Sequence, residues 1–198
     1  MDERHPTLAI GSNAAPAQLE SKFALAANIS DLVPLTRVTV KGISAGYSAH
    51  ISKQGYIAYT PIKLDVESTL FMLWLDDAQL AHIHATEPNY VPTTVKTFPA
   101  VLESGENIEA YLLYRSKWGA IASSLHGPRA ASTQQRIFQF LARSPRLVKL
   151  VPELADGHAA TVARLAADED LRTRLHKALG EESFVTPDGL PDEHTMGR

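Results

Sequence analysis

The hydrophobic period of this 198-residue chain changes once along its length, and this change constrains the fold more than any single motif does. From about residue 6 to 115, short runs rich in β-branched and aromatic residues are separated by turn residues, which is typical of strands. From about 130 to 179, apolar residues recur at helical spacing instead. Strands in one part and helices in the other predict an α+β fold rather than a regular βαβ sheet.

The candidate strands of the first zone are short apolar runs that end near glycine or polar turn residues. They are Thr7–Ile10, Leu35–Ile43, Tyr47–Ser52, Ile57–Leu64, Thr69–Leu75, Thr93–Val101 and Ile108–Tyr114. Two short helices are expected between them. Ala15–Ala27 has apolar residues at helical spacing, with Asn13 placed to cap it. Asp76–Ala85 begins with acidic residues, which the helix dipole favours.

Capping and breaking residues divide the helical zone. Thr133 can cap a helix that ends near Ser144–Pro145, and a short helix over Pro145–Val151 should follow. Helical spacing resumes over Ala159–Leu179, where the acidic run Asp168–Asp170 can end one helix and begin another. Because the apolar stripes of this zone are one-sided, they need a partner surface. We expect them to pack on the strand-rich first zone rather than to form a separate domain.

Composition excludes several classes of protein. Lys and Arg total 19 against 22 for Asp and Glu, giving a net charge of −3, whereas nucleic-acid binders are usually basic. The chain has no cysteine, so it has no disulfide, thiolate metal site or cysteine nucleophile. No apolar run approaches the ~18 residues of a membrane span, and the first residues lack the order of a signal peptide. We therefore expect a cytoplasmic protein without nucleic-acid or membrane partners.

The segment Gly42-Ile43-Ser44-Ala45-Gly46 fits the G-x-S-x-G pattern of a serine hydrolase. That chemistry needs a helix directly after the serine. Here the following residues alternate as a strand does, and little chain precedes Ser44 to supply the usual earlier strands. A glycine-flanked turn is the favoured interpretation, and a serine hydrolase through Ser44 ranks last among the functions considered.

His82, His84 and Glu87 lie close together in the sequence. On a helix, residues two apart point to different sides, so the two histidines would not share a metal. His84 and Glu87 alone do not make a metal site. We therefore expect no bound metal.

Two other segments carry chemistry. The strand ending at Ile10 runs into Gly11-Ser12-Asn13, where backbone N–H groups at a loop and helix start can hold a developing negative charge. Glu87 lies in a short loop after the second expected helix, three residues before Tyr90. A carboxylate flanked by apolar and aromatic residues can serve as a general base. Each segment alone is also ordinary turn chemistry.

Taken together, the two segments resemble the γ-glutamylcyclotransferase-like family. In that family the first strand ends in a Tyr-Gly-Ser-Asn-Leu loop, and a later Leu-Asp-x-x-Glu-Gly-x-Tyr segment carries the catalytic glutamate. The matching residues here are Gly11, Ser12 and Asn13 in the loop, and Glu87 and Tyr90 in the second motif. The resemblance covers about residues 6 to 115.

Three residues depart from the family pattern. Ile10 stands where the family usually has tyrosine, His84 replaces the aspartate of the glutamate motif, and Pro88 replaces the glycine after Glu87. Because the missing tyrosine lines the family's pocket, these differences indicate a divergent member that acts on something other than a plain γ-glutamyl amino acid, or an inactive one.

The resemblance implies a small closed mixed β-barrel flanked by helices over residues 1–128. A helical extension would follow over 129–180, and a flexible tail over 181–198. The implied activity is that of a cyclotransferase, an acyltransferase or amide lyase that cleaves a γ-glutamyl or related amide. Glu87 would be catalytic, and the substrate-binding residues would be Ile10, Gly11, Ser12, Asn13 and Tyr90.

This chemistry needs no cofactor, and the implied partner is a small-molecule amide, with a homodimer left open. The alternative is a non-catalytic protein that retains the barrel pocket and binds a small molecule.

Overall fold

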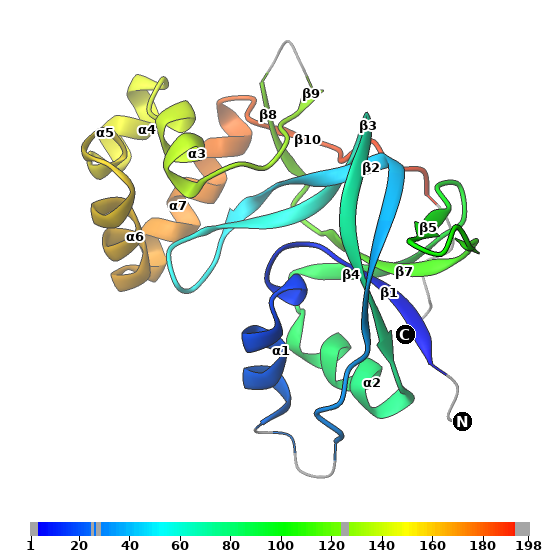
Figure 1. The fold of residues 1–198 in the computed structure, drawn as a ribbon. Helices are drawn as coiled ribbons and strands as arrows, with labels where there is room; N and C mark the ends of the chain where they lie inside the picture. The colour runs from blue at the N-terminus through cyan, green and yellow to red at the C-terminus, as the bar shows by residue number, and fades with distance from the viewer. Residues whose placement is uncertain (1–3, 25, 27–28, 124–126, 193–198) are drawn as a thin grey trace. The chain divides into compact units, whose positions relative to one another are not determined.

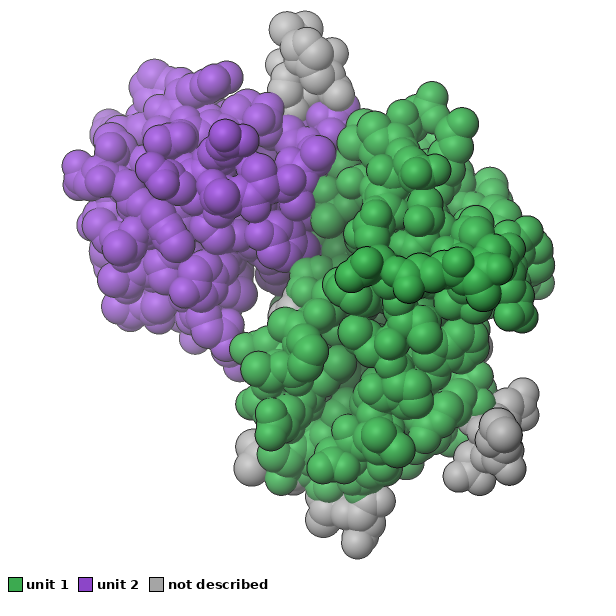
Figure 2. All heavy atoms as spheres, in the orientation of Figure 1, with its two compact units in different colours: residues 1–45, 60–117, 189–198 green, residues 46–59, 118–188 purple. Residues whose placement is uncertain are grey.

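The computed structural model describes residues 4–24, 26, 29–123 and 127–192, and of Ser12 and Ser123 it describes the backbone alone (Figure 1). The chain forms two compact units, which Figure 2 colours separately. The first contains residues 1–45, 60–117 and 189–198, and the second contains 46–59 and 118–188. These units interleave along the chain, so they differ from the consecutive segments 1–128, 129–180 and 181–198 expected from the sequence.

The first unit is built on a curled, mixed sheet. Its strands are β1 (His5–Ala9), β2 (Leu35–Ile51), β3 (Ile57–Leu75), β4 (Tyr90–Val95), β5 (Ala100–Leu102), β6 (Asn107–Ile108) and β7 (Tyr111–Ser116), with β2 and β3 extending into the second unit. Strand β1 pairs antiparallel with β3 on one side and parallel with β7 on the other. The predicted α+β class with a mixed sheet is therefore confirmed.

The expected closure of the barrel is corrected by the strand order. Within the first unit the pairing runs β6-β5-β2-β3-β1-β7-β4, and no described pairing joins β6 to β4. The sheet is therefore a half-barrel rather than a closed barrel.

Strands β2 and β3 are each longer than the sequence predicted. In β2 the glycines taken as turns lie inside continuous strand, and in β3 the polar residues between two predicted strands do so. Gly42 has a φ of 94°, and a Cβ there would lie 2.5 Å from the ring of Phe98. The glycine thus permits a close approach within β2 instead of ending it. The chain continues as strand from Ser44 to Ile51, so the strand-to-helix elbow of a serine hydrolase is absent at this motif.

Two helices cover one face of this sheet. The buried residues Leu19 and Phe23 of α1 (Pro16–Phe23) share a core with Leu80 and Ile83 of α2 (Asp77–Thr86). Asp76 caps α2 in a capping box with Gln79, which confirms the predicted start of that helix.

The predicted cap of α1 was wrong. The N-cap residue is Ala15, without a side-chain hydrogen bond, and Pro16 begins the helix. Residues Gly11–Ala14 form a separate 3₁₀ turn, η1. The side chain of Asn13 is thereby available for a different contact, described below. The helix also ends earlier than the predicted range Ala15–Ala27, because its last residue is Phe23.

The second unit combines helices with short strands. The helices are α3 (Gln134–Leu141), α4 (Pro145–Leu150), α5 (Glu153–Asp156), α6 (His158–Ala167) and α7 (Glu169–Glu181). Thr133 caps α3, as predicted, and Asp168 caps α7 at the start of the acidic run that was expected to separate two helices. The helical residues Phe138, Leu171 and Leu175 share one core with the strand residues Tyr47 and Ile121. The apolar stripes therefore have strand partners inside this unit, whereas they were expected to pack on the strand-rich first domain.

Short strands complete the second unit. Strands β8 (Ala120–Ser123), β9 (Gly127–Pro128) and β10 (Val185–Thr186) were not predicted. Strand β10 pairs antiparallel with β8 in the segment expected to be a flexible tail. Leu190 is also buried, in the first unit. A flexible tail was expected over residues 181–198, but this strand and this buried residue show that the segment up to 192 is structured. Residues 193–198 lie outside the described part of the chain. Among the described residues, no helix is long and apolar enough to cross a membrane.

Candidate active site

Helix α2 places Glu87 beside the loop that follows β1. Strands β1 and β3 are antiparallel, with His5 opposite Leu75 and Ala9 opposite Phe71, so α2 begins at the His5 end of β1. There His5 Nε2 lies 2.7 Å from Oδ1 of Asp77. The 10 residues of α2 span about 15 Å. The five residues of β1 span a similar length, about 16 Å. The end of α2 therefore returns to the end of β1.

Three side chains meet at this point. Asn13 Nδ2 donates a hydrogen bond to Oε1 of Glu87 at 3.2 Å, and Lys22 Nζ donates to the same oxygen at 2.5 Å. Lys22 Nζ also donates to Oδ1 of Asn13 at 2.7 Å, which closes the network. The side chains of Lys22 and Glu87 are 18% and 13% exposed, so the ion pair is largely shielded but still reaches the surface.

The position of Lys22 follows from the packing of α1 on α2. Phe23, the next residue, is buried, and its ring centroid lies 5.7 Å from that of His82 in α2. Nε2 of His82 lies 2.9 Å from the backbone oxygen of Lys22, within hydrogen-bond distance. These contacts hold the last turn of α1 against α2, and they direct the lysine side chain to the end of that helix.

The charge of Glu87 affects the pKa of two nearby tyrosines. Burial and the Glu87 carboxylate both raise the pKa of Tyr90 and of Tyr114 well above the usual value for a tyrosine. Both hydroxyls therefore stay protonated near neutral pH and can donate hydrogen bonds. The Tyr114 hydroxyl lies 2.8 Å from Nδ1 of His84, whose pKa is lowered by burial. The histidine is thus predominantly neutral at that pH.

The structure brings together several residues that the sequence singled out. Glu87 caps the end of α2 and meets Asn13, and the Tyr90 N–H donates to the Glu87 backbone oxygen at 3.1 Å, in a tight turn. Gly11 opens η1 with a φ of 71°, a conformation that favours glycine. Ile10 packs partly buried against the sheet core, and the side chain of Ser12 is outside the described atoms.

Sequence reasoning missed Lys22 and Tyr114. A single lysine on an amphipathic helix has no distinguishing pattern, and Tyr114 lies within an apolar run that indicates only a strand. His82 and His84 were expected on different faces, and they do contact different partners, Lys22 and Tyr114. Within the described ranges, no group of three or more histidine, aspartate or glutamate side chains could hold a metal ion.

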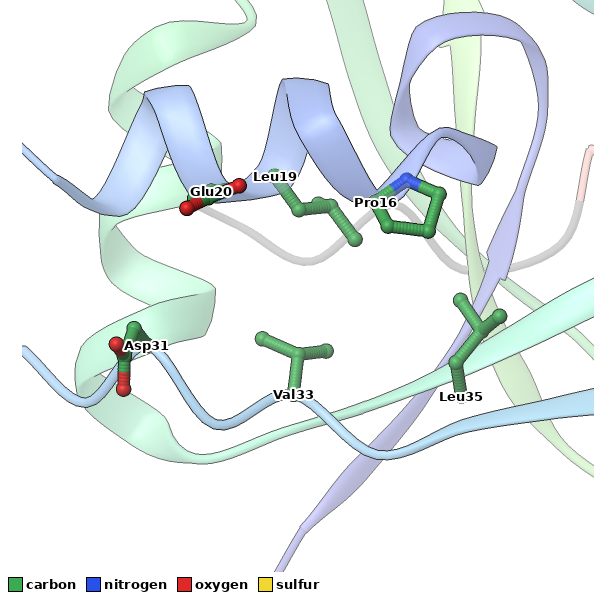
Figure 3. Close-up of a pocket in the computed structure, with 6 residues that line it drawn as sticks. All are labelled: Pro16, Leu19, Glu20, Asp31, Val33 and Leu35. Atoms are coloured by element: carbon green, nitrogen blue, oxygen red, sulfur yellow. The ribbon is translucent and has the colours of Figure 1, made fainter.

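A separate cavity lies along α1. It has a volume of about 320 Å³ and is lined by Pro16, Leu19, Glu20, Asp31, Val33 and Leu35 (Figure 3). In the figure, Leu19 and Pro16 face Val33 and Leu35 across the cavity. None of these lining residues belongs to the network of Asn13, Lys22 and Glu87, so this cavity is distinct from that network.

Comparison with known proteins finds no matching family model and no matching curated protein. Solved structures do match. A structure named gamma-glutamyl cyclotransferase is 12% identical with a TM-score of 0.48, covering 93% of this chain and 89% of the other. The chain is similar in fold to gamma-glutamyl cyclotransferases.

Two further structures show the range of this similarity. A yeast gamma-glutamyl cyclotransferase specific to glutathione is 10% identical with a TM-score of 0.40, covering 91% of this chain and 97% of the other. A solution structure from Arabidopsis thaliana is 13% identical with a TM-score of 0.44, covering 59% of this chain and 64% of the other. With every one of these TM-scores below 0.5, the chemistry of this chain has to be argued from its own residues.

Proposed function

We propose that this chain is a cyclotransferase-like enzyme that cleaves a γ-glutamyl or related amide. The proposal rests on one observation above all, the 3.2 Å contact between Asn13 Nδ2 and Glu87 Oε1. This contact joins the Gly-Ser-Asn loop to the glutamate segment across 74 positions of sequence. Those are the two segments on which the family resemblance depends.

The reaction is an intramolecular aminolysis. The α-amine of the substrate attacks its own γ-carbonyl, which closes a five-membered lactam and expels an amine. Because nucleophile and carbonyl are already tethered, the protein mainly has to select the conformer that closes. Glu87 takes a proton from the attacking nitrogen and then gives one to the leaving nitrogen.

The network gives the two oxygens of Glu87 different roles. Lys22 and Asn13 both donate to Oε1, so we assign the proton transfer to Oε2, to which neither donates. Backbone N–H groups in the turn from Gly11 to Asn13 would stabilise the oxyanion. The Glu87 carboxylate raises the pKa of both Tyr90 and Tyr114, and their protonated hydroxyls add hydrogen-bond donors to this region.

A second function is favoured by the ion pair itself. The 2.5 Å contact holds the Glu87 carboxylate against Lys22, as a purely structural pair would. Together with Ile10 and Pro88, this supports a non-catalytic protein that binds a small molecule at the same place.

A substrate screen separates the two functions. The chain is incubated with γ-glutamyl peptides and γ-glutamyl amines, and released amine and lactam are measured together. Equal amounts of amine and lactam are expected from the cyclotransferase. Release of amine with free glutamate would contradict intramolecular attack, because water would then be the nucleophile. Saturable binding of these compounds without turnover would favour the binding protein.

A further inference from the structure

The ion pair of Lys22 and Glu87 has unused hydrogen-bonding capacity on both partners. An ammonium group has three N–H donors, and among the described residues Lys22 donates to two acceptors, Asn13 Oδ1 and Glu87 Oε1. Glu87 likewise receives both of its described side-chain hydrogen bonds on Oε1. One donor and one carboxylate oxygen therefore remain side by side on partly exposed groups.

This arrangement is complementary to a zwitterion. An α-amino acid head carries an ammonium and a carboxylate on one carbon, and a fixed cation beside a fixed anion can pair with both at once. Glu87 would receive the ammonium and Lys22 the carboxylate. We infer that Lys22 binds the α-carboxylate of the substrate.

The inference adds a binding role for Lys22 to the proposed function. It rests on that function only for the identity of the bond that is cleaved. If Lys22 merely fixes the position of Glu87, every substrate should depend on it equally. If Lys22 contacts the α-carboxylate, only substrates with that group should depend on it. Lys22 is thus a specificity-determining residue, and its role can be measured by comparing two substrates that differ in this group alone.

The kinetic experiment uses a γ-glutamyl amide and the same compound with its α-carboxylate converted to a carboxamide. The unmodified protein should favour the free carboxylate by about tenfold to a hundredfold in kcat/KM, the range for a hydrogen bond to a charged group. Lys22→Met should reduce this preference to about one, and Lys22→Arg should keep part of it. Lys41→Met, which removes an exposed lysine of β2 in the same unit, is the matched control and should leave the preference unchanged.

A binding experiment removes the dependence on turnover. L-Norvaline and L-norvalinamide have no γ-carbonyl and cannot cyclise, and calorimetry compares their affinities. Tighter binding of L-norvaline, lost in Lys22→Met, supports the assignment. That result combined with no turnover on any γ-glutamyl compound would keep Lys22 as the carboxylate-binding residue and discard the cyclotransferase.

Other outcomes overturn the assignment. Turnover without a preference for the free α-carboxylate would discard the role of Lys22 and keep the proposed function. Equal binding of the two norvaline compounds, or binding of neither, would also discard it. If Lys22→Met does not fold, the substrate pair can still overturn the assignment on the unmodified protein alone, because the lack of a preference there would contradict it.

Discussion

Ser48 Oγ lies 2.6 Å from Nδ1 of His50, inside the second unit. The two residues are separated by one position of β2, so their side chains share one face of the strand. Burial, and to a smaller extent the charge of the nearby His176, together lower the pKa of His50 from 6.5 to about 4. His50 is therefore neutral in the folded protein over most of the range in which an unfolded histidine becomes charged.

The folded protein should lose stability between pH 6.5 and pH 4 because of His50. Above pH 6.5 the residue is neutral in both states and contributes no pH dependence. As the pH falls below 6.5 the unfolded chain takes up the proton first, so unfolding becomes more favourable until the folded state is also protonated near pH 4. The loss from this group alone is about 3 kcal/mol.

Urea unfolding at pH 7.5 and at pH 4.5 measures this effect. Carboxylates also titrate in part of this window, so His50→Gln is the matched control, and the difference between the two proteins isolates the histidine. An identical pH dependence in both proteins would show that His50 is not kept neutral by the fold.

Replacing the proposed general base should remove turnover. Glu87→Gln keeps the size of the side chain and can still accept from Asn13 and Lys22, but it cannot take a proton. General acid–base catalysis is worth about 10² to 10⁴ in rate, so kcat should fall at least about a hundredfold. Stability should fall by about 1 to 3 kcal/mol, because the hydrogen bonds survive but the largely shielded ammonium of Lys22 loses its counter-charge.

The turnover of Glu87→Gln is compared with that of Ser12→Ala. Its effect should be milder, because the proposed oxyanion donors are backbone groups that the change leaves in place. Steady-state kinetics and thermal unfolding on all three proteins provide the test. Near-full turnover by Glu87→Gln would remove Glu87 from the mechanism and move the binding function ahead.

Gly55 should be among the least replaceable glycines of the second unit. Its φ is 83°, and a Cβ there would lie 2.2 Å from the backbone oxygen of Val162 in α6. Gly55→Ala should therefore cost well over the roughly 1 kcal/mol of the positive φ alone, since backbone of a packed helix would have to move. Gly127 has a φ of 68° and no described atom within 4 Å of an added Cβ.

Gly127→Ala is the matched control, because it carries the conformational cost without the clash. Chemical unfolding of both variants should give the larger loss for Gly55→Ala. Similar losses in the two proteins would show that the approach of Val162 is not a constraint in solution.

Ser44 should not behave as a nucleophile. It lies within β2, and its motif lacks the helix that exposes the serine of a hydrolase. A fluorophosphonate probe should leave the chain unlabelled at this residue, and Ser44→Ala should retain the activity of the unmodified protein. Stoichiometric labelling lost in Ser44→Ala would overturn both the function and the interpretation of this strand.

The local features of the fold were readable from the sequence. Thr133, Asp76 and Asp168 were predicted as helix starts because a cap depends on a few neighbouring residues. The glycines of β2 were misread because a glycine signals a turn and a close approach in the same way. Only the tertiary position of Phe98 shows that Gly42 serves the second purpose.

The candidate site was readable only in part. Glu87 and Asn13 were found through motifs, although the local signal at Asn13 indicated a helix cap. Its side chain instead contacts a residue 74 positions away. Lys22 had no signal at all, because its importance comes from a contact across 65 positions of sequence. Such contacts depend on strand register and helix length, which periodicity does not determine.

The match between the lengths of α2 and β1 has a consequence for how this gene product tolerates insertions and deletions. Removing one residue between Asp77 and Thr86 would rotate Glu87 by about 100° around the helix axis and draw it back by about 1.5 Å. Either change separates the carboxylate from Asn13 and Lys22. The turn at Gly105, which has open space around it, carries no such requirement. In a library of single-codon deletions, we expect few active clones with a deletion in α2 and many with a deletion in the turn at Gly105.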